Sequence, residues 1–134
     1  MDTSAVTAWV DMYVRAWNSN DPADIGRLFT DDAVYHTGPF DAPWEGREMI
    51  IRKWLSRQDA PGTTSFRYEV LASTSDQAVV RGWTHYHETG REYSNIWLIR
   101  FGMDGRCREF TEWWVARPKS RARTKRGPER AHST

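Results

Sequence analysis

The spacing of the apolar residues changes near Phe66, and this change restricts the fold more than any other feature of the chain. Before it, apolar residues recur at every third or fourth position, which is the spacing of one face of an amphipathic helix. After it they alternate with polar residues, as in half-buried strands. Helical spacing covers residues 3–17 and 47–58, a short helix capped by Asp21-Pro22 lies between them, and strand spacing covers residues 31–37, 66–72, 77–88, 91–102 and 106–116. Helices followed by an antiparallel meander predict an α+β domain.

The overall charge of +1 conceals an uneven distribution along the 134 residues. Residues 117–134 contain seven Lys or Arg and one Glu, whereas residues 1–116 contain twelve basic and seventeen acidic residues. The last stretch has no apolar periodicity, so we expect a disordered basic tail after a single domain of residues 1–116. Its charge suits either a weak contact with an anionic surface or nucleic acid, or a solvated extension without a partner.

Several classes of protein are excluded by what the sequence lacks. Cys107 is the only cysteine, which rules out an intramolecular disulfide and a zinc site built from several cysteines. No apolar run reaches the roughly 18 residues that a membrane span needs, and no secretion signal is present, so we expect a cytoplasmic location. The chain has no phosphate-binding loop, dinucleotide fingerprint or Ser/His/Asp set, and we therefore expect no cofactor.

The short turns between the last three strands predict which side chains share a face of the sheet. With Thr89-Gly90 as a two-residue turn, Gly82 lies opposite Trp97, and with Asp104-Gly105 as the next turn, Trp97 lies opposite Glu112. Neither face is purely polar, so we expect the helices to cover one face and a second subunit to cover the other. The first face carries Gly82, Thr84, Tyr86, Tyr93, Asn95, Trp97, Ile99, Phe110, Glu112 and Trp114, and the second carries Trp83, His85, His87, Ser94, Ile96, Leu98, Arg100, Glu109, Thr111 and Trp113.

Three stretches together carry a resemblance to a known superfamily. They are "WNSNDPADIGRLFTDDAVYH", the proline-containing loop that ends in "WEGREMI", and the late strands with "GRE" and "EFTEWW". Over roughly residues 5–116 the chain resembles the nuclear-transport-factor-two-like superfamily, which includes SnoaL-like polyketide cyclases and ketosteroid isomerases. The resemblance implies a cone-shaped, curved antiparallel β-sheet packed around three N-terminal helices, a deep and mostly apolar pocket, and a homodimer formed through the sheet.

The ketosteroid isomerase pattern can be followed residue by residue, and it fits only in part. Tyr13 matches the oxyanion tyrosine, but Thr37 stands at the position of the base and Trp97 at that of the second oxyanion acid. Because neither can replace an acid, the resemblance predicts no isomerase of that kind. Related cyclases keep an acidic residue in the pocket, and Glu112 is the candidate here. We therefore predict that Glu112 transfers a proton and that Tyr13 stabilises an oxyanion.

His36 lies beside Tyr35 at the pocket mouth in this resemblance, either as a partner base for Glu112 or as an edge-strand residue bonded to a loop. His85 and His87, at i and i+2, could ligate a metal, but they lie on the face opposite the pocket, so no metal is predicted. Phe40 and Trp44 either cover the pocket entrance or pack their loop onto the third helix. The residues predicted to contact a ligand are Tyr35, Thr37, Phe40, Trp44, Tyr86, Asn95, Trp97, Phe110 and Trp114.

These features predict a SnoaL-like protein that binds an apolar or aromatic small molecule in an aromatic-lined pocket. If it is an enzyme, the expected chemistry is cofactor-free acid/base catalysis of the cyclase, isomerase or dehydratase type. The alternative is a non-catalytic binding or assembly module whose pocket is filled by its own side chains, because Trp97 stands at the depth where the isomerase has an acid.

Overall fold

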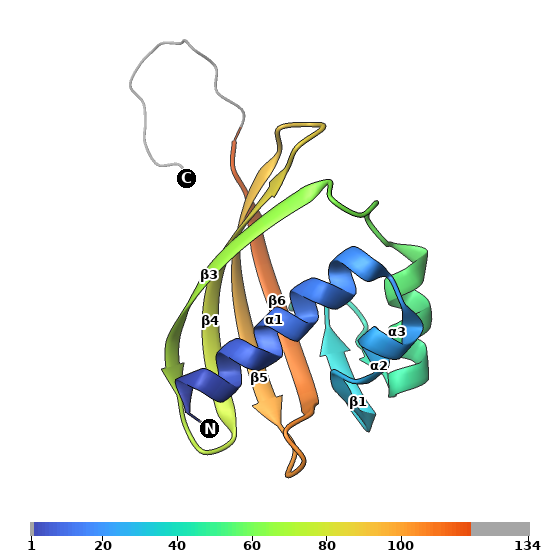
Figure 1. Cartoon of the computed structure of the whole chain (residues 1–134), viewed down its shortest axis with the longest axis vertical. Coiled ribbons are helices and arrows are strands. Elements are labelled where there is room, and N and C mark those ends of the chain that lie inside the picture. The colour runs from blue at the N-terminus through green and yellow to red at the C-terminus, as the bar shows by residue number, and fades with distance from the viewer. Residues whose placement is uncertain (1, 119–134) are drawn as a thin grey trace.

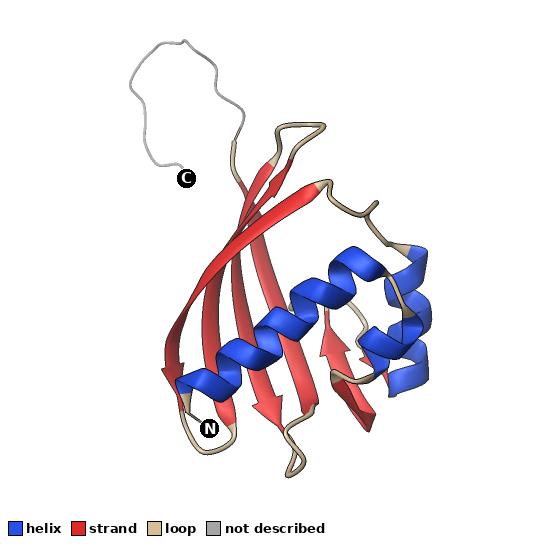
Figure 2. Ribbon diagram, in the orientation of Figure 1, coloured by secondary structure: helices blue, strands red, loops and turns tan. Residues whose placement is uncertain are grey.

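The computed structural model describes residues 2–118, and within this range the chain forms three helices and one curved, open sheet (Figure 1). Helix α1 lies across the concave face of the sheet, and α2 and α3 lie beside one end of it (Figures 1 and 2). The elements are α1 (Thr3–Ser19), α2 (Pro22–Gly26), β1 (Phe29–His36), β2 (Trp44–Glu45), α3 (Arg47–Ser56), β3 (Thr64–Ser73), β4 (Gln77–Tyr86), β5 (Glu92–Phe101) and β6 (Cys107–Ala116).

Local sequence signals set the helix ends. The Asp2 carboxylate accepts a hydrogen bond from the backbone N–H of Ala5 at 2.9 Å, which caps the start of α1. Asn20, in the left-handed region at φ 53°, ends this helix. Asp21 caps α2 as predicted, and Pro22 occupies its first turn. The buried stripe of α1 includes Val6, Trp9, Val10, Tyr13 and Ala16.

The strands follow the order β2-β1-β6-β5-β4-β3. Strands β3 to β6 form the predicted antiparallel meander, but β1 pairs with β6 in the parallel direction, so the sheet is mixed rather than wholly antiparallel. The loop after β1 folds back as the short strand β2, which pairs Trp44 with Tyr35. This fold-back was not predicted. Because of this pairing, the loop after β1 lies along the edge of the sheet, on the side that the helices cover.

One of the two predicted registers is correct. Between β5 and β6, Trp97 lies opposite Glu112 and Asn95 opposite Trp114, as predicted. Between β4 and β5 the predicted register is wrong by two residues, because Gly82 lies opposite Asn95 and not opposite Trp97. The connection is longer than a two-residue turn: the backbone N–H of Tyr86 bonds the carbonyl of Arg91, and Gly90 takes the left-handed position at φ 72°. A shift of two preserves the alternation, so the assignment to faces holds.

The core between α1 and the sheet is an aromatic cluster. The Tyr13 ring lies 4.5 Å from the Trp97 ring and 5.4 Å from the Phe110 ring, centroid to centroid. Phe66 stacks on Trp97 at 4.9 Å with an interplanar angle of 15°. Gly82 is required beneath it, because a Cβ there would lie 2.4 Å from the Phe66 ring.

The opposite face of the sheet leaves large apolar side chains uncovered. Leu98 is 42 % exposed and Trp113 is 52 % exposed. Arg67 lies over the Trp83 ring at 4.2 Å on the same face. We call the face that carries Trp83, Ile96, Leu98 and Trp113 the outer face.

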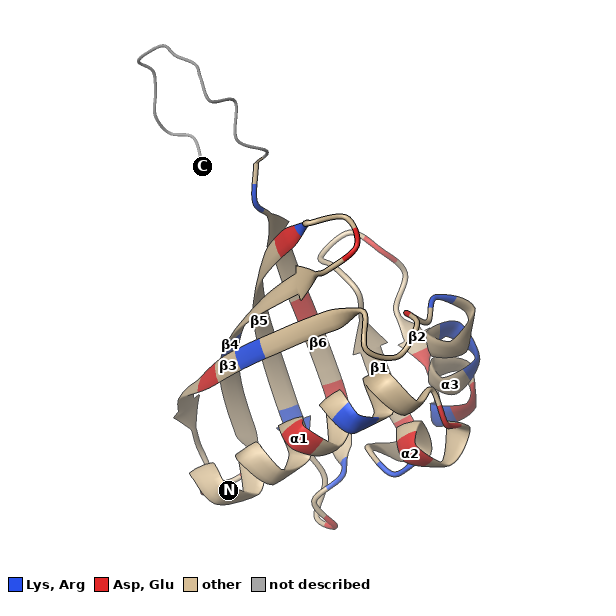
Figure 3. Ribbon diagram, turned by 45° about the horizontal axis from the view of Figure 1, so that its top comes forward, with Lys and Arg blue, Asp and Glu red and all other residues tan. Residues whose placement is uncertain are grey.

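The charged residues of the described chain are spread over several elements. Figure 3 shows acidic positions on β6 and several basic positions on α3.

Two expectations from the sequence remain, the basic tail and the absence of a membrane-spanning helix. Residues 119–134, most of the expected basic tail, lie outside the described residues. Arg117, at its start, forms an ion pair with Glu92 at 2.6 Å. None of the helices within residues 2–118 is long and apolar enough to cross a membrane.

Candidate functional site

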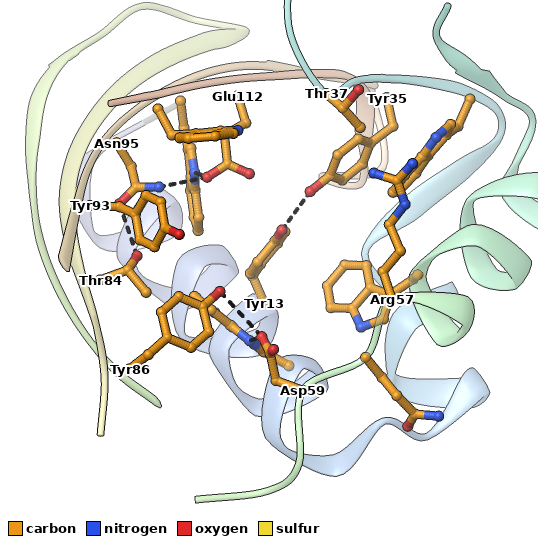
Figure 4. Close-up of a pocket in the computed structure, with 16 residues that line it drawn as sticks. Tyr13, Tyr35, Thr37, Arg57, Asp59, Thr84, Tyr86, Tyr93, Asn95 and Glu112 are labelled. Carbon is orange, nitrogen blue, oxygen red and sulfur yellow. Dashed lines mark hydrogen bonds between the residues drawn. The ribbon is translucent and has the colours of Figure 1, made fainter. Parts of the chain in front are cut away.

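A cavity of about 320 Å³ lies between α1, the end of α3 and the concave face of the sheet (Figure 4). Its volume is at the lower end of the roughly 300–1,000 Å³ of small-molecule sites, which suits a compound of one or two rings. Aromatic side chains form most of its wall, and a few polar groups interrupt it. The cavity is lined by Tyr13, Trp17, Tyr35, Thr37, Trp44, Trp54, Arg57, Gln58, Asp59, Thr84, Tyr86, Tyr93, Asn95, Trp97, Glu112 and Trp114.

Glu112 projects from β6 into this cavity, held by donors from the neighbouring strand. Its Oε2 accepts hydrogen bonds from Asn95 Nδ2 at 2.7 Å and from Trp97 Nε1 at 3.2 Å. Thr84 donates its hydroxyl proton to Asn95 Oδ1 at 2.9 Å, which fixes the orientation of that amide. Burial raises the pKa of Glu112, and the two hydrogen bonds oppose part of that rise. The carboxyl is therefore a stronger base, when ionised, than an exposed glutamate.

Two tyrosine hydroxyls meet on the other side of the cavity. The Tyr13 and Tyr35 oxygens lie 2.6 Å apart and share a hydrogen bond, and both side chains point into the cavity with Glu112 (Figure 4). Burial raises the pKa of each hydroxyl well above its ordinary value, and the nearby Glu112 charge adds to the rise. Both hydroxyls therefore keep their protons at neutral pH. Since only one proton lies between the two oxygens, the pair retains a second O–H for a ligand.

The loop after α3 adds two charged residues that the sequence did not single out. Asp59 Oδ2 accepts a hydrogen bond from Trp17 Nε1 at 2.9 Å and a longer one from the Tyr86 hydroxyl at 3.4 Å. Arg57 lies with its guanidinium carbon 5.4 Å from the Trp44 ring centroid. In the sequence this stretch reads only as the end of a helix, so nothing there indicates that it folds back over the cavity.

Most of the side chains predicted to contact a ligand line the cavity. Phe110 does not: it is fully buried behind the wall, packed between Tyr35 and Tyr13. Phe40 does not either, because it is 97 % exposed and projects from the loop after β1. The predicted residues that line the cavity are Tyr13, Tyr35, Thr37, Trp44, Tyr86, Asn95, Trp97, Glu112 and Trp114.

The three histidines within residues 2–118 lie away from the cavity. His36 points to the outer face, where its Nε2 lies 2.9 Å from Glu109 Oε2, so it cannot serve as a partner base for Glu112. Strand alternation explains this, because Tyr35 and Thr37 on either side of it face the cavity. His85 contacts Glu92, and His87 contacts the Ser65 hydroxyl. No cluster of three His, Cys, Asp or Glu side chains in residues 2–118 is arranged to hold a metal ion.

The comparisons with known proteins agree with this architecture. Residues 10–110 match the model of the SnoaL-like domain. The chain belongs to the SnoaL-like domain family. No curated protein matches this SnoaL-like chain.

Solved structures show the fold that the sequence resemblance predicted. An NTF-2-like protein of unknown function from Burkholderia xenovorans LB400 has a TM-score of 0.70 at 13% identity, over 87% of this chain and 88% of that one. A ketosteroid isomerase-like protein from Erwinia carotovora atroseptica SCRI1043 has a TM-score of 0.62 at 21% identity, over 84% and 95%. A steroid delta-isomerase from Pseudomonas aeruginosa has a TM-score of 0.59 at 24% identity, over 88% and 82%. At these identities the likeness shows the fold alone, so the α+β cone is confirmed. The predicted superfamily is confirmed by the match to the SnoaL-like domain.

Proposed function

We propose that this SnoaL-like protein binds an apolar or aromatic small molecule in the cavity and acts on it by cofactor-free acid/base chemistry. The observation that carries the proposal is the convergence on one cavity of a partly buried carboxylate, Glu112, and a protonated hydroxyl pair, Tyr13 and Tyr35. A base and an oxyanion donor facing one aromatic-walled space are the parts needed to remove a proton next to a carbonyl group.

The chemical step follows from these roles. A ligand carbonyl oxygen accepts a hydrogen bond from the free hydroxyl proton of the Tyr13–Tyr35 pair. The Glu112 carboxylate takes a proton from the adjacent carbon, the C–H bonding pair moves into the new C=C bond, and the charge that develops on the oxygen is stabilised by the hydroxyl. The protonated Glu112 then returns the proton at another carbon, or to a leaving hydroxyl or a new alkoxide. These outcomes are isomerisation, dehydration and aldol-type cyclisation.

The identity of two wall residues argues for Glu112 over the base used by ketosteroid isomerases. Thr37 occupies that base position and lines the cavity, but it has no group that takes a proton at neutral pH. Trp97 occupies the second oxyanion position, and its indole N–H bonds Glu112 instead of a ligand. In this chain the Trp97 indole therefore orients the Glu112 carboxylate.

A test that needs no known substrate is hydrogen exchange of a simple bicyclic ketone, 2-tetralone, in D₂O, followed by NMR. We expect the wild-type protein to accelerate exchange at the carbon next to the carbonyl, and Glu112→Gln to lower that acceleration by about a hundredfold or more. The matched control is Glu109→Gln, a carboxylate on the same strand that faces outward to His36. Binding of 2-tetralone without any acceleration would refute the catalytic part and leave a binding protein.

The rival function is a non-catalytic module with a self-filled pocket. Trp97 is 1 % exposed and stacks on Phe66, so its ring is part of the wall and the cavity remains open beside it. This supports ligand binding over the rival.

Assembly is a second property of the proposal. Leu98 and Trp113, with Trp83 and Ile96, give the outer face the apolar surface that a homodimer through the sheet would bury. A cytoplasmic location and an anionic partner for the basic tail stay predictions from the sequence.

A further inference from the structure

Arg57 supplies a positive charge to a cavity whose other charged residues are acids. It follows α3 directly and lies across the cavity from Glu112, with Tyr13 between them (Figure 4). Among the described residues, it is the one arginine or lysine that lines this cavity. The Trp44 ring lies beside its guanidinium group, 5.4 Å from carbon to centroid, which holds the flat group at the aromatic wall.

Arg57 has no carboxylate partner within residues 2–118. Several other arginines of the described chain are paired, for example Arg47 with Asp31 and Arg100 with Glu109. Asp59 lies two residues after Arg57 and also lines the cavity, but it accepts hydrogen bonds from Trp17 and Tyr86 instead. The donors of the guanidinium are thus left for a group that the protein does not provide.

The positive charge of Arg57 acts on a side chain inside the cavity, Tyr35. Burial raises the pKa of Tyr35, and the positive charge of Arg57 opposes part of that rise. Glu112 and Asp59 line other parts of the wall, and each would repel a negative group. An anionic group therefore has one favourable position in the cavity, at Arg57 beside Trp44.

We propose that the ligand of this cavity is an aromatic carboxylate, with its carboxylate bound by Arg57 and its uncharged polar end at Glu112 and the tyrosine pair. The inference rests on the proposed function, since it names the class of ligand for the same cavity. A guanidinium binds a carboxylate through two parallel N–H donors, and the flat aromatic walls accept a one- or two-ring system.

The test compares two probes of the same shape and different charge, 2-naphthoate and naphthalene-2-carboxamide, by isothermal titration calorimetry at low salt. We expect the wild-type protein to bind the carboxylate about tenfold more tightly than the amide. Arg57→Gln should remove this preference while changing the amide affinity by less than about twofold. The matched control is Arg52→Gln, an exposed arginine on α3 that does not line the cavity and should keep the preference.

The outcomes separate this inference from the function on which it rests. Equal binding of both probes by the wild-type protein, or a preference that survives Arg57→Gln, would overturn the role of Arg57 and leave the binding cavity in place. Failure of both probes to bind the wild-type protein would overturn the proposed function and this inference with it. Because Arg57 is exposed, its substitution is not expected to unfold the chain, and an unchanged melting temperature checks this.

Discussion

Gly82 offers a direct test of how the wall of the cavity is built. In Gly82→Ala, the new Cβ would lie 2.4 Å from the Cε1 and Cζ atoms of Phe66, where ordinary carbon contacts are about 3.5–4.0 Å. The ring must retreat by about 1 Å or more, which disturbs its stacking on Trp97, now at 4.9 Å between centroids. Overpacking of this kind costs about 1–3 kcal/mol, and the lost stacking adds about 0.5–1.5 kcal/mol.

The substitution also raises the free energy of unfolding by about 0.5–1 kcal/mol, because alanine restricts the unfolded chain more than glycine does. We therefore expect Gly82→Ala to lower the free energy of unfolding by about 2 kcal/mol, measured by urea denaturation with an unchanged slope. With an unfolding entropy of about 2 cal/mol/K per residue over roughly 120 residues, the melting temperature should fall by about 8 °C.

A double-mutant cycle with Phe66→Ala decides whether the clash is the cause. In that background Gly82→Ala should be neutral or slightly stabilising, giving a coupling energy of about 2 kcal/mol. The control is Gly26→Ala, whose Cβ would meet Ile51 Cδ1 at an ordinary 3.6 Å and should not destabilise. An equal loss from Gly82→Ala with and without the Phe66 ring would refute the reasoning.

Two further predictions concern Glu112 and the outer face. Because burial raises the pKa of Glu112, the ionised form destabilises the folded state, so this group's contribution is most favourable at acid pH and is lost as the pH rises through its raised value. At about pH 8, Glu112→Gln should therefore melt at a higher temperature than the wild-type protein, and at about pH 4 the two should melt at nearly the same temperature. A lower melting temperature of Glu112→Gln at about pH 8 would contradict this. Sedimentation velocity should show that Trp113→Glu converts the homodimer to a monomer. The control Met103→Glu, in the exposed turn before β6, should remain a dimer. An unchanged mass for Trp113→Glu would count against the outer face as the interface.

The sequence predicted the parts of the fold that depend on neighbouring residues. The spacing of apolar residues located the helices and the meander, and the Asp104-Gly105 turn placed Trp97 opposite Glu112. The Thr89-Gly90 turn led to a wrong pairing of β4 with β5, since the same residues also fit a four-residue loop with glycine in the left-handed position. A shift of two residues preserves the alternation of side chains, so Thr84 and Tyr86 of β4 were still correctly expected on the same face as Trp97 of β5.

The features that the sequence did not predict arise from contacts between distant segments. The parallel pairing of β1 with β6 has no local signal, because the two strands lie far apart along the chain. Arg57 and Asp59 belong to a stretch whose composition indicates only that a helix ends, and their place at the cavity depends on the packing of α3 against β1. Phe40 was expected either to cover the cavity entrance or to pack its loop onto α3, yet its side chain is 97 % exposed.

The parallel pairing of β1 with β6 also governs the order in which the protein can form. During synthesis, β1 leaves the ribosome long before β6, and at about 5–20 residues per second the wait is on the order of several seconds. Until then β1 has only the two-residue β2 beside it, and its other edge offers unpaired backbone groups to any strand nearby. In this interval the uncovered edge of β1 is a site at which the nascent chain can aggregate. A fragment that stops before β6 lacks both the strand that protects β1 and the carboxylate in the cavity wall.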